Sequence, residues 1–401
     1  MPSVFSGLEE SSVDPIINLM IACKKDDHPN KIDVSVGVYQ SESGDPHYVF
    51  PCVRAAKEHL MEKDPGHCYT LMTGIADYLS SAQKTIFGAN PSNVASVQAV
   101  AGSGSLHLAF SLLKSIGYKD FYIGTPSWSN YRGMIEHVGC NYIEYPYYNY
   151  ETRSVDIEAV KKALNEAPSK SVFVLQAVCH NPTGCDLSHD QWSLIFDIIQ
   201  QRGLFLVFDI AYQGLSSGDV NKDAWAIREA YSRKMEFIAC QSYSKNLGLY
   251  SERAGCTHVC TWDLANQNTV TSKLVAISRN EVSFAPAFGA RIAALVQTDP
   301  RLQQMWAEDV LRVGSRLQDV RKQALDWFVK LQTPGDWSHI LELAGLFWFS
   351  GITQLQSEKL IEEYHIYALS NGRVNVAGLN NSNVEYFCRS VDAIVRKFPS
   401  N

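Results

Sequence analysis

The chain has 401 residues, of which 46% are hydrophobic and 19% charged, and its formal net charge is −7. This composition supports a large packed core and excludes intrinsic disorder. The acidic balance argues against nucleic acid or an acidic membrane surface as a partner, and no run of 18 apolar residues exists to span a membrane.

The ten cysteines are scattered without a CxxC pair, and most lie inside apolar runs, so we expect buried, reduced thiols. Cys256, His258 and Cys260 alternate along one expected strand. A zinc site is conceivable there, but no second ligand pair follows, so a core strand is the favoured interpretation. The first residues carry no basic side chain before Lys24 and no continuous apolar block, so we expect neither a signal nor a transit peptide and a cytoplasmic location.

In chain order, residues 1–30 are polar and are expected to form an irregular arm. From about residue 95 to 262, strand-like and helix-like segments alternate, and Ser188 with Gln191 forms a capping box before one of the helices. This alternation predicts an α/β fold with a mostly parallel, right-handed wound sheet. The expected strands are 94–100, 121–123, 142–145, 172–175, 204–208, 237–240 and 256–261.

The pattern changes after residue 300. Residues 301–331 have the spacing of one long amphipathic helix. They are followed by a short strand at 346–349, a helix at 355–364, a short strand near 373–376 and a final helix. These elements predict a smaller α+β domain.

Chemically useful side chains follow four of the expected strands. Residues 101–105 are Ala-Gly-Ser-Gly-Ser, residues 179–184 are Cys-His-Asn-Pro-Thr-Gly, and Asp209 and Lys245 each follow an apolar run. Taken singly, these are a turn, a loop, a helix cap and a surface lysine. Ligands of open α/β sheets bind at the carboxyl ends of the strands, so together the four predict one site. A dinucleotide loop is excluded because His107 occupies the third glycine position, and no Gly-Lys-Ser/Thr follows to make a Walker loop.

One chemistry accounts for all of these groups. A phosphorylated aldehyde cofactor needs an amine that holds it as a Schiff base, an anion beside its ring nitrogen, donors to its ring oxygen, and a phosphate cradle at a helix N-terminus. Lys245 supplies the amine, Asp209 the anion, and Asn181 and Tyr212 the oxygen donors. The expected phosphate ligands are Gly102, Ser103, Ser242, Ser244 and Arg253.

The chain resembles the fold-type I pyridoxal-phosphate aminotransferases, and among them the aspartate aminotransferases. The similarity runs nearly from end to end. It is carried by "DVSVGVY" (33–39), "AGSGSL" (101–106), "PSWSNY" (126–131), "HNPTG" (180–184), "DIAYQG" (209–214), "SYSKNLGLYSERAG" (242–255), "GARIAA" (289–294) and "SNGRVNVAGL" (370–379).

This resemblance implies a division into residues 1–40 (arm and part of a small domain), 41–305 (large domain that binds pyridoxal 5′-phosphate) and 306–401 (small domain). It also implies that Lys245 moves the proton during catalysis and that Trp128 covers the cofactor ring. No metal is expected.

For the substrate, the resemblance implies that Arg373 binds the α-carboxylate and that Arg279 crosses a homodimer to bind the distal carboxylate. Gly37 lets the backbone approach the substrate, and Trp128 and Asn181 also contact it. Tyr69 is expected to reach the phosphate of the neighbouring subunit, so that the two active sites are shared.

The sequence departs from the family pattern at three places. Ala101 stands where the family has a serine, which removes one phosphate donor. Tyr131 replaces the histidine that normally backs the ring-nitrogen aspartate, and tyrosine does not titrate near neutrality. The segment 282–286 differs from the usual sequence after the distal arginine.

The expected activity is reversible amino transfer between L-aspartate and 2-oxoglutarate, which gives oxaloacetate and L-glutamate. A broad-specificity or aromatic amino-acid aminotransferase on the same scaffold is the alternative within the enzyme class. A catalytically inert relative would lack the lysine or the aspartate, and both Lys245 and Asp209 are present.

Overall fold

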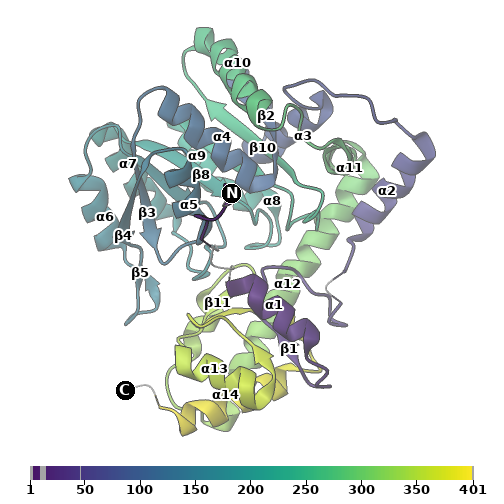
Figure 1. The fold of residues 1–401 in the computed structure, drawn as a ribbon, viewed down its shortest axis with the longest axis vertical. Helices are drawn as coiled ribbons and strands as arrows, with labels where there is room; N and C mark the ends of the chain where they lie inside the picture. Colours follow the sequence, from purple (N-terminus) through teal and green to yellow (C-terminus); the bar gives the residue numbers. More distant parts are fainter. Residues whose placement is uncertain (1–2, 10–14, 46, 400–401) are drawn as a thin grey trace.

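The computed structural model describes residues 3–9, 15–45 and 47–399. Figure 1 shows a larger α/β part above a smaller part, with the long helix α12 (Pro300–Leu331) running from one to the other. Among the described residues, no helix is both long and apolar enough to cross a membrane.

The larger part is built on a seven-stranded sheet with the order β2-β10-β9-β8-β7-β3-β4. Only β10 runs antiparallel to its neighbours in this sheet. The mostly parallel α/β sheet predicted from the sequence is therefore confirmed. The strands are β2 (Val94–Val100), β3 (Asp120–Thr125), β4 (Asn141–Pro146), β7 (Val172–Gln176), β8 (Phe205–Ile210), β9 (Phe237–Ser242) and β10 (Ala254–Cys260).

Helices cover both faces of this sheet, which is why its strands are apolar on both sides. One face packs against α4 (Ala101–Ser115), α5 (Asn130–His137) and α10 (Leu264–Glu281) through residues such as Phe110, Ile135 and Leu274. The other face packs against α3 (Ala76–Phe87), α6 (Ile157–Glu166), α7 (His189–Arg202), α9 (Trp225–Ser232) and α11 (Ala287–Thr298). Helix α7 begins with the predicted capping box of Ser188 and Gln191.

The remaining elements of the larger part are short or lie at its edge. They are α2 (Pro51–Lys63), α8 (Val220–Asp223), and the hairpin of β5 (Tyr148–Asn149) and β6 (Ser154–Val155).

The smaller part combines segments from both ends of the described chain. Strand β1 (Ile32–Asp33) pairs in parallel with β12 (Ile366–Tyr367), and β11 (Phe347–Phe349) pairs antiparallel with β13 (Arg373–Asn375). Around them lie α13 (Gln354–Tyr364), α14 (Val384–Lys397) and the 3₁₀ turns Ser338–Glu342 and Val376–Gly378. The boundaries expected at residues 40 and 305 stay a prediction, since α12 is continuous through the second of them.

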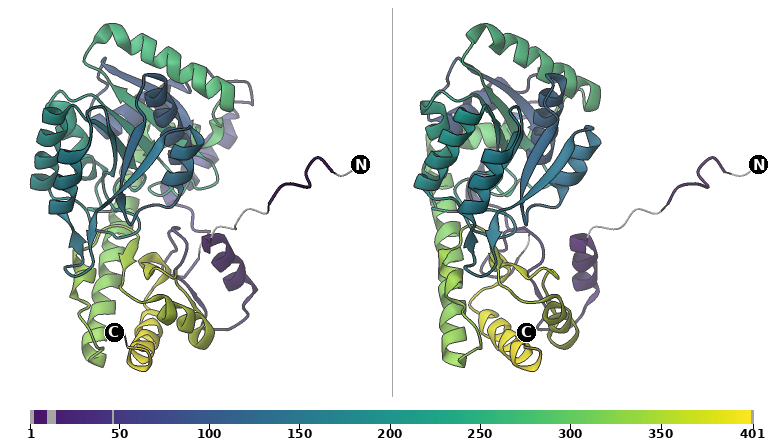
Figure 2. Two further views of the ribbon diagram at one scale, coloured as in Figure 1. Left: turned by 60° about the vertical axis from the view of Figure 1, so that its left-hand side comes forward. Right: turned by 90° about the vertical axis from the view of Figure 1, so that its left-hand side faces the viewer.

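The N-terminal segment differs from the sequence prediction. Residues 1–30 were expected to be irregular, but Pro15–Lys25 forms helix α1, which lies beside the smaller part (Figure 1). Residues 3–9 extend away from the rest of the molecule, as Figure 2 shows. Residues 1–2 and 10–14 of the expected arm lie outside the described residues.

A buried arginine fixes the smaller part to α12. Arg321 is fully buried, and its Nη2 donates to the carbonyl oxygens of Gly345 at 2.7 Å and Phe347 at 3.1 Å. Burial lowers the pKa of Arg321 to about 10. The guanidinium thus satisfies two carbonyl oxygens at the start of β11. The loop of Gly184 lies close to the same segment, because the Gly184 carbonyl oxygen accepts a hydrogen bond from the Ala344 N–H at 2.9 Å.

The close packing at Gly184 gives a stability prediction. Gly184 has φ +72°, and an added Cβ would lie 2.6 Å from the Phe347 carbonyl oxygen and 3.1 Å from Leu343 Cβ. We expect Gly184→Ala to lose about 1–2 kcal/mol from the left-handed backbone and about 1–3 kcal/mol more from overpacking. Urea unfolding measures the loss.

The matched control is Gly203→Ala. Gly203 has φ +63°, but no heavy atom lies within 4 Å of its added Cβ, so this variant should show the backbone cost alone. Equal losses in the two variants would contradict the proposed clash.

Candidate active site

A cavity of about 100 Å³ opens where the parallel strands end. Strand β10 runs the opposite way, so its first residues lie at the same edge as the last residues of its neighbours. Most residues predicted from the sequence meet in the lining of this cavity: Gly102, Ser103, Trp128, Asn181, Asp209, Tyr212, Ser242, Ser244, Lys245 and Arg253.

Asp209 is the buried acid of the cavity. It lies near the end of β8 with 7% of its surface exposed, and its Oδ2 accepts a hydrogen bond from the Tyr131 hydroxyl at 2.6 Å. Its Oδ1 is buried and has no hydrogen-bond partner among the described residues. Burial raises the pKa of Asp209 to about 6, while the Tyr131 hydrogen bond and the charge of Lys245 lower it. A buried, unpaired carboxylate oxygen is costly, so this one is positioned to accept from a bound group.

Lys245 lies in the loop after β9, with its Nζ 5.2 Å from the centre of the Tyr212 ring. Burial lowers the pKa of Lys245 to about 8, Asp209 opposes this shift, and Arg253 adds to it. Desolvation favours the neutral form of an amine, which is the nucleophilic form. The site therefore holds an amine and a carboxyl group whose pKa values are both moved toward neutrality.

Backbone amides, hydroxyls and a guanidinium gather at the N-terminus of α4. Arg253 Nη2 donates to Ser103 Oγ at 3.1 Å, and Ser242 Oγ donates to Ser244 Oγ at 3.1 Å. The first N–H groups of a helix have no partner within the helix and carry a partial positive charge. Together with Arg253, they make this end of the cavity suitable for an anion such as a phosphate. Ala101, which has φ +54°, donates its N–H to the Arg253 carbonyl oxygen at 3.1 Å.

Gln176 is a lining residue that the sequence analysis missed. Its Nε2 donates to the Asn181 carbonyl oxygen at 3.0 Å, and its Oε1 accepts from the Asn181 N–H at 2.8 Å. This pair fixes the loop that presents the Asn181 side chain to the cavity. Gln176 is the last residue of β7, so its place at the end of an apolar run was the one signal that could have found it.

Arg373 and Gly37 come from the smaller part and are not among the lining residues, but each approaches one of them. Arg373 is 4% exposed, and its Nη1 donates to Asn181 Oδ1 at 3.0 Å while its Nη2 donates to the Ser35 carbonyl oxygen at 2.5 Å. A Cβ added to Gly37 would lie 2.9 Å from the Phe347 ring and 3.8 Å from the Tyr212 hydroxyl. The backbone at Gly37 therefore approaches the site more closely than a larger residue allows.

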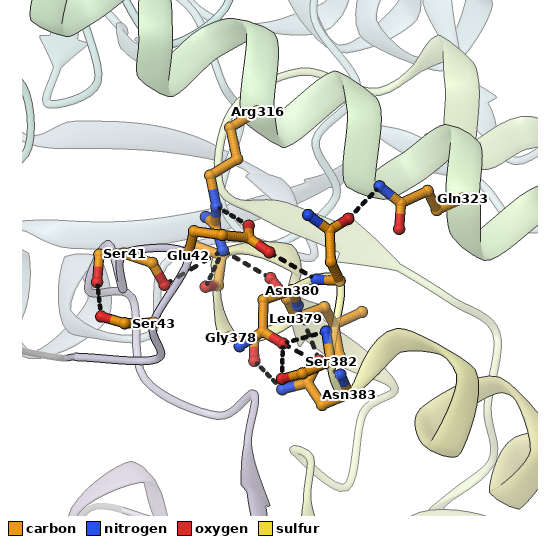
Figure 3. Close-up of polar contacts among 12 residues, drawn as sticks. Ser41, Glu42, Ser43, Arg316, Gln323, Gly378, Leu379, Asn380, Ser382 and Asn383 are labelled. Atoms are coloured by element: carbon orange, nitrogen blue, oxygen red, sulfur yellow. Dashed lines mark hydrogen bonds and ion pairs between the residues drawn. The ribbon is translucent and has the colours of Figure 1, made fainter.

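The segment that carries Gly37 is tied to the smaller part by Arg316 of α12. Its Nε donates to Glu42 Oε2 at 3.0 Å, and its Nη2 donates to the Leu379 carbonyl oxygen at 2.7 Å (Figure 3). Glu42 Oε1 in turn accepts from the Asn381 N–H at 2.8 Å. The segment before α2 is thereby linked to both α12 and the residues after β13.

Two further predicted residues, Tyr69 and Arg279, also lie outside the cavity lining of their own chain. Tyr69 is 82% exposed and stacks on Phe284 with 4.7 Å between ring centres. Arg279 lies exposed in the last turn of α10, and its Nη1 contacts Met72 Sδ at 3.7 Å. Since Met72 follows Tyr69 closely in the chain, the two residues share one exposed surface.

The structure does not support a zinc site on β10. His258 is fully buried, and its ring contacts Ser96 Oγ at 2.7 Å and Gln241 Oε1 at 3.0 Å. Within residues 3–9, 15–45 and 47–399, no three His, Cys, Asp or Glu side chains are grouped to hold a metal ion. His258 belongs to a polar contact inside the core, in line with the interpretation favoured from the sequence.

In this α/β fold, one cavity holds a buried amine and a buried carboxylate beside a helix terminus that suits an anion. The model of the family described as class I and II aminotransferases matches residues 29–391. The chain therefore belongs to the class I and II aminotransferases. This confirms the fold and the enzyme class expected from the sequence motifs.

Individual relatives agree with this assignment. The cytoplasmic aspartate aminotransferase of Schizosaccharomyces pombe is 38% identical and aligns over 98% of this chain and 99% of that protein. The solved aspartate aminotransferase from the Saccharomyces cerevisiae cytoplasm has a TM-score of 0.96 and 35% identity, covering 98% of this chain and 99% of that one. An aromatic-amino-acid aminotransferase from Burkholderia pseudomallei, covalently bound to pyridoxal phosphate, has a TM-score of 0.95 and 32% identity, covering 98% and 100%.

The lowered pKa of Lys245 predicts selective labelling in the cofactor-free protein. An amine-reactive reagent should modify Lys245 with a midpoint near pH 8, because the neutral amine forms as pH rises through its pKa. Solvent-exposed lysines titrate near ~10.4. Peptide mass mapping across a pH series measures both, and a Lys245 curve that coincides with those of surface lysines would contradict the effect of burial.

Proposed function

We propose that this protein is a pyridoxal-phosphate-dependent aspartate aminotransferase, which transfers an amino group reversibly between L-aspartate and 2-oxoglutarate. The observation that carries the proposal is the placement of Lys245 and Asp209 in one cavity, together with the anion-binding end of α4. The names of the relatives support the same activity.

The residues of the cavity fit pyridoxal 5′-phosphate. Asp209 Oδ1 is a buried acceptor that no described residue satisfies, which suits a protonated ring nitrogen. Gly102, Ser103 and Arg253 suit the phosphate, and Asn181 and Tyr212 suit the ring oxygen. When bound, the cofactor supplies an aldehyde that reacts with amines and a protonated ring that withdraws electrons.

In the proposed mechanism, Lys245 is the base and acid of the proton transfer. Its neutral amine would take the proton from the substrate Cα and return it at C4′ of a bound cofactor, and its pKa of about 8 suits this task near neutral pH. Asp209 would keep the ring nitrogen of a bound cofactor protonated, and Trp128 would cover one face of its ring. Arg373 binds the α-carboxylate of the substrate.

The distal carboxylate of the substrate is assigned to Arg279 of the partner subunit in a homodimer, and the partner's Tyr69 is assigned to the phosphate. Support comes from the exposure of both side chains on one surface and from their absence from the cavity lining of their own chain. Two guanidinium groups, each able to bind a carboxylate with two hydrogen bonds, favour a dicarboxylic substrate.

A hybrid-dimer experiment tests Lys245 and the shared site together. We expect Lys245→Ala to lower kcat by about 10⁴-fold or more, because no other amine lines the described cavity. Lys162→Ala, at an exposed position of α6, is the matched control and should keep full activity. Aspartate turnover is measured in a coupled assay.

Mixing and refolding Lys245→Ala with Arg279→Leu should restore activity to about a quarter of wild type, since half the dimers are hybrids with one intact site each. Each variant alone should have at most about a hundredth of the wild-type kcat/KM for aspartate. Failure of the mixture to exceed the sum of its components would contradict the shared site, whereas activity in Lys245→Ala alone would contradict the assignment of the amine.

A broad-specificity or aromatic aminotransferase is the second candidate. It is favoured by structural relatives such as the aromatic amino-acid aminotransferase from Burkholderia cenocepacia, at a TM-score of 0.94 and 31% identity. The same Arg279→Leu variant separates the two functions.

We expect Arg279→Leu to lower kcat/KM for aspartate by about 10²-fold or more and to leave kcat/KM for phenylalanine nearly unchanged. The reason is that only aspartate has a distal carboxylate, which loses its partner in this variant. Half-reaction spectra with a panel of amino acids measure both constants. Equal losses for the two substrates would indicate a structural role for Arg279.

A cytoplasmic location is part of the proposal. Relatives named as cytoplasmic support it, and relatives named as mitochondrial match over a similar length. Cell fractionation with an antibody to this protein distinguishes the two compartments.

A further inference from the structure

The contact between Tyr131 and Asp209 differs in chemistry from the one that the family resemblance implies, because a tyrosine hydroxyl does not titrate near neutrality as the family's histidine does. Tyr131 lies in the first turn of α5, is 2% exposed, and donates its hydroxyl to Asp209 Oδ2 at 2.6 Å. Its ring packs edge-on against Trp128, with ring centres 5.3 Å apart. The hydroxyl is thereby held in place by packing on one side and by the carboxylate on the other.

This contact uses one carboxylate oxygen and leaves the other for the cavity. Asp209 Oδ1 has no hydrogen-bond partner in the described part of the chain, and Oδ2 is occupied. A hydrogen bond to an ionised acceptor is shorter and stronger than one between neutral groups. Tyr131 therefore stabilises the charged form of Asp209 and fixes which oxygen can meet a bound group.

The groups that face Asp209 come from four elements. They are Tyr131 of α5, Lys245 after β9, Tyr212 after β8 and Cys240 of β9. Burial raises the pKa of both tyrosines and of the thiol, so these three remain protonated and uncharged through the neutral range. Lys245 is the one neighbour in this set that titrates there, and it lies on the cavity side.

We propose that Tyr131 is the positioning residue of Asp209, and that its hydroxyl holds the carboxylate ionised with Oδ1 directed at the ring nitrogen of the cofactor across neutral pH. A tyrosine does this without a charge change of its own, whereas an imidazole gains and loses a proton in this range. The inference rests on the proposed function, because it assigns the ring nitrogen as the partner of Oδ1.

Tyr131→Phe tests the hydroxyl alone. Loss of the donor raises the pKa of Asp209, so the protonated acid should appear at a higher pH as the solution is acidified. Cofactor affinity should then fall on the acid side at a higher pH than in the wild type, and should be about tenfold or more weaker near neutrality. The binding probe is pyridoxine 5′-phosphate, which keeps the ring nitrogen and phosphate but has an alcohol in place of the aldehyde, so it forms no Schiff base with Lys245.

The same variants are also measured as holoenzymes, by the pH dependence of the cofactor absorption spectrum. The matched control is Tyr145→Phe, because Tyr145 is 4% exposed and its hydroxyl has no hydrogen-bond partner among the described residues. It should match the wild type in both measurements. Thermal unfolding of each cofactor-free variant shows that the fold is retained.

Tyr131→His is the second variant, since an imidazole can donate to the same oxygen. It should recover most of the affinity at neutral pH and add a second spectral transition between about pH 5 and 8. A Tyr131→Phe curve that coincides with the wild type would overturn the inference, as would equal losses in the Phe and His variants, which would assign the effect to ring packing. Failure of the wild type to bind the probe or the cofactor would instead overturn the proposed function.

Discussion

The structure depends on keeping one amine and one carboxyl group close together out of water. Burial disfavours the charged form of each group more strongly than their mutual attraction favours it. Lys245 and Asp209 therefore both have pKa values displaced toward neutrality. Such a pair persists only where the surrounding backbone is rigid. The parallel sheet provides that rigidity. Its strands β8 and β9 are neighbours, so Asp209 near the end of β8 and Lys245 after β9 lie at the same edge of the sheet.

Guanidinium groups connect this edge to the smaller part of the molecule. Arg321 satisfies the carbonyls next to β11, Arg316 links the segment before α2 to the residues after β13, and Arg373 contacts the loop of Asn181. All three bind carbonyl or amide oxygens, and Arg316 also pairs with a carboxylate. Because an arginine has five donors in a planar array, one side chain can bridge segments that are far apart in sequence.

Most of the sheet and the cavity lining could be predicted from the sequence, because strand ends in an α/β fold carry a strong local signal. Asp209 and Lys245 each follow an apolar run, and the Gly-rich residues 101–105 open the periodic helix α4. The prediction failed at α1, whose Ile17, Met20 and Ile21 are exposed, so its apolar residues do not mark a buried face. The contact of Arg373 with Asn181 has no local signal, since it depends on how separate segments pack.

The contacts of Arg373 have a consequence for the thermodynamics of ligand capture. Its guanidinium is already immobilised by Asn181 and by the Ser35 carbonyl before any carboxylate arrives. Ordering a long side chain on association costs about 0.5–1.5 kcal/mol, and the Arg373 side chain is already ordered when the protein folds. If Arg373 binds a carboxylate as proposed, capture of a small acid should therefore lose little rotamer freedom at this residue.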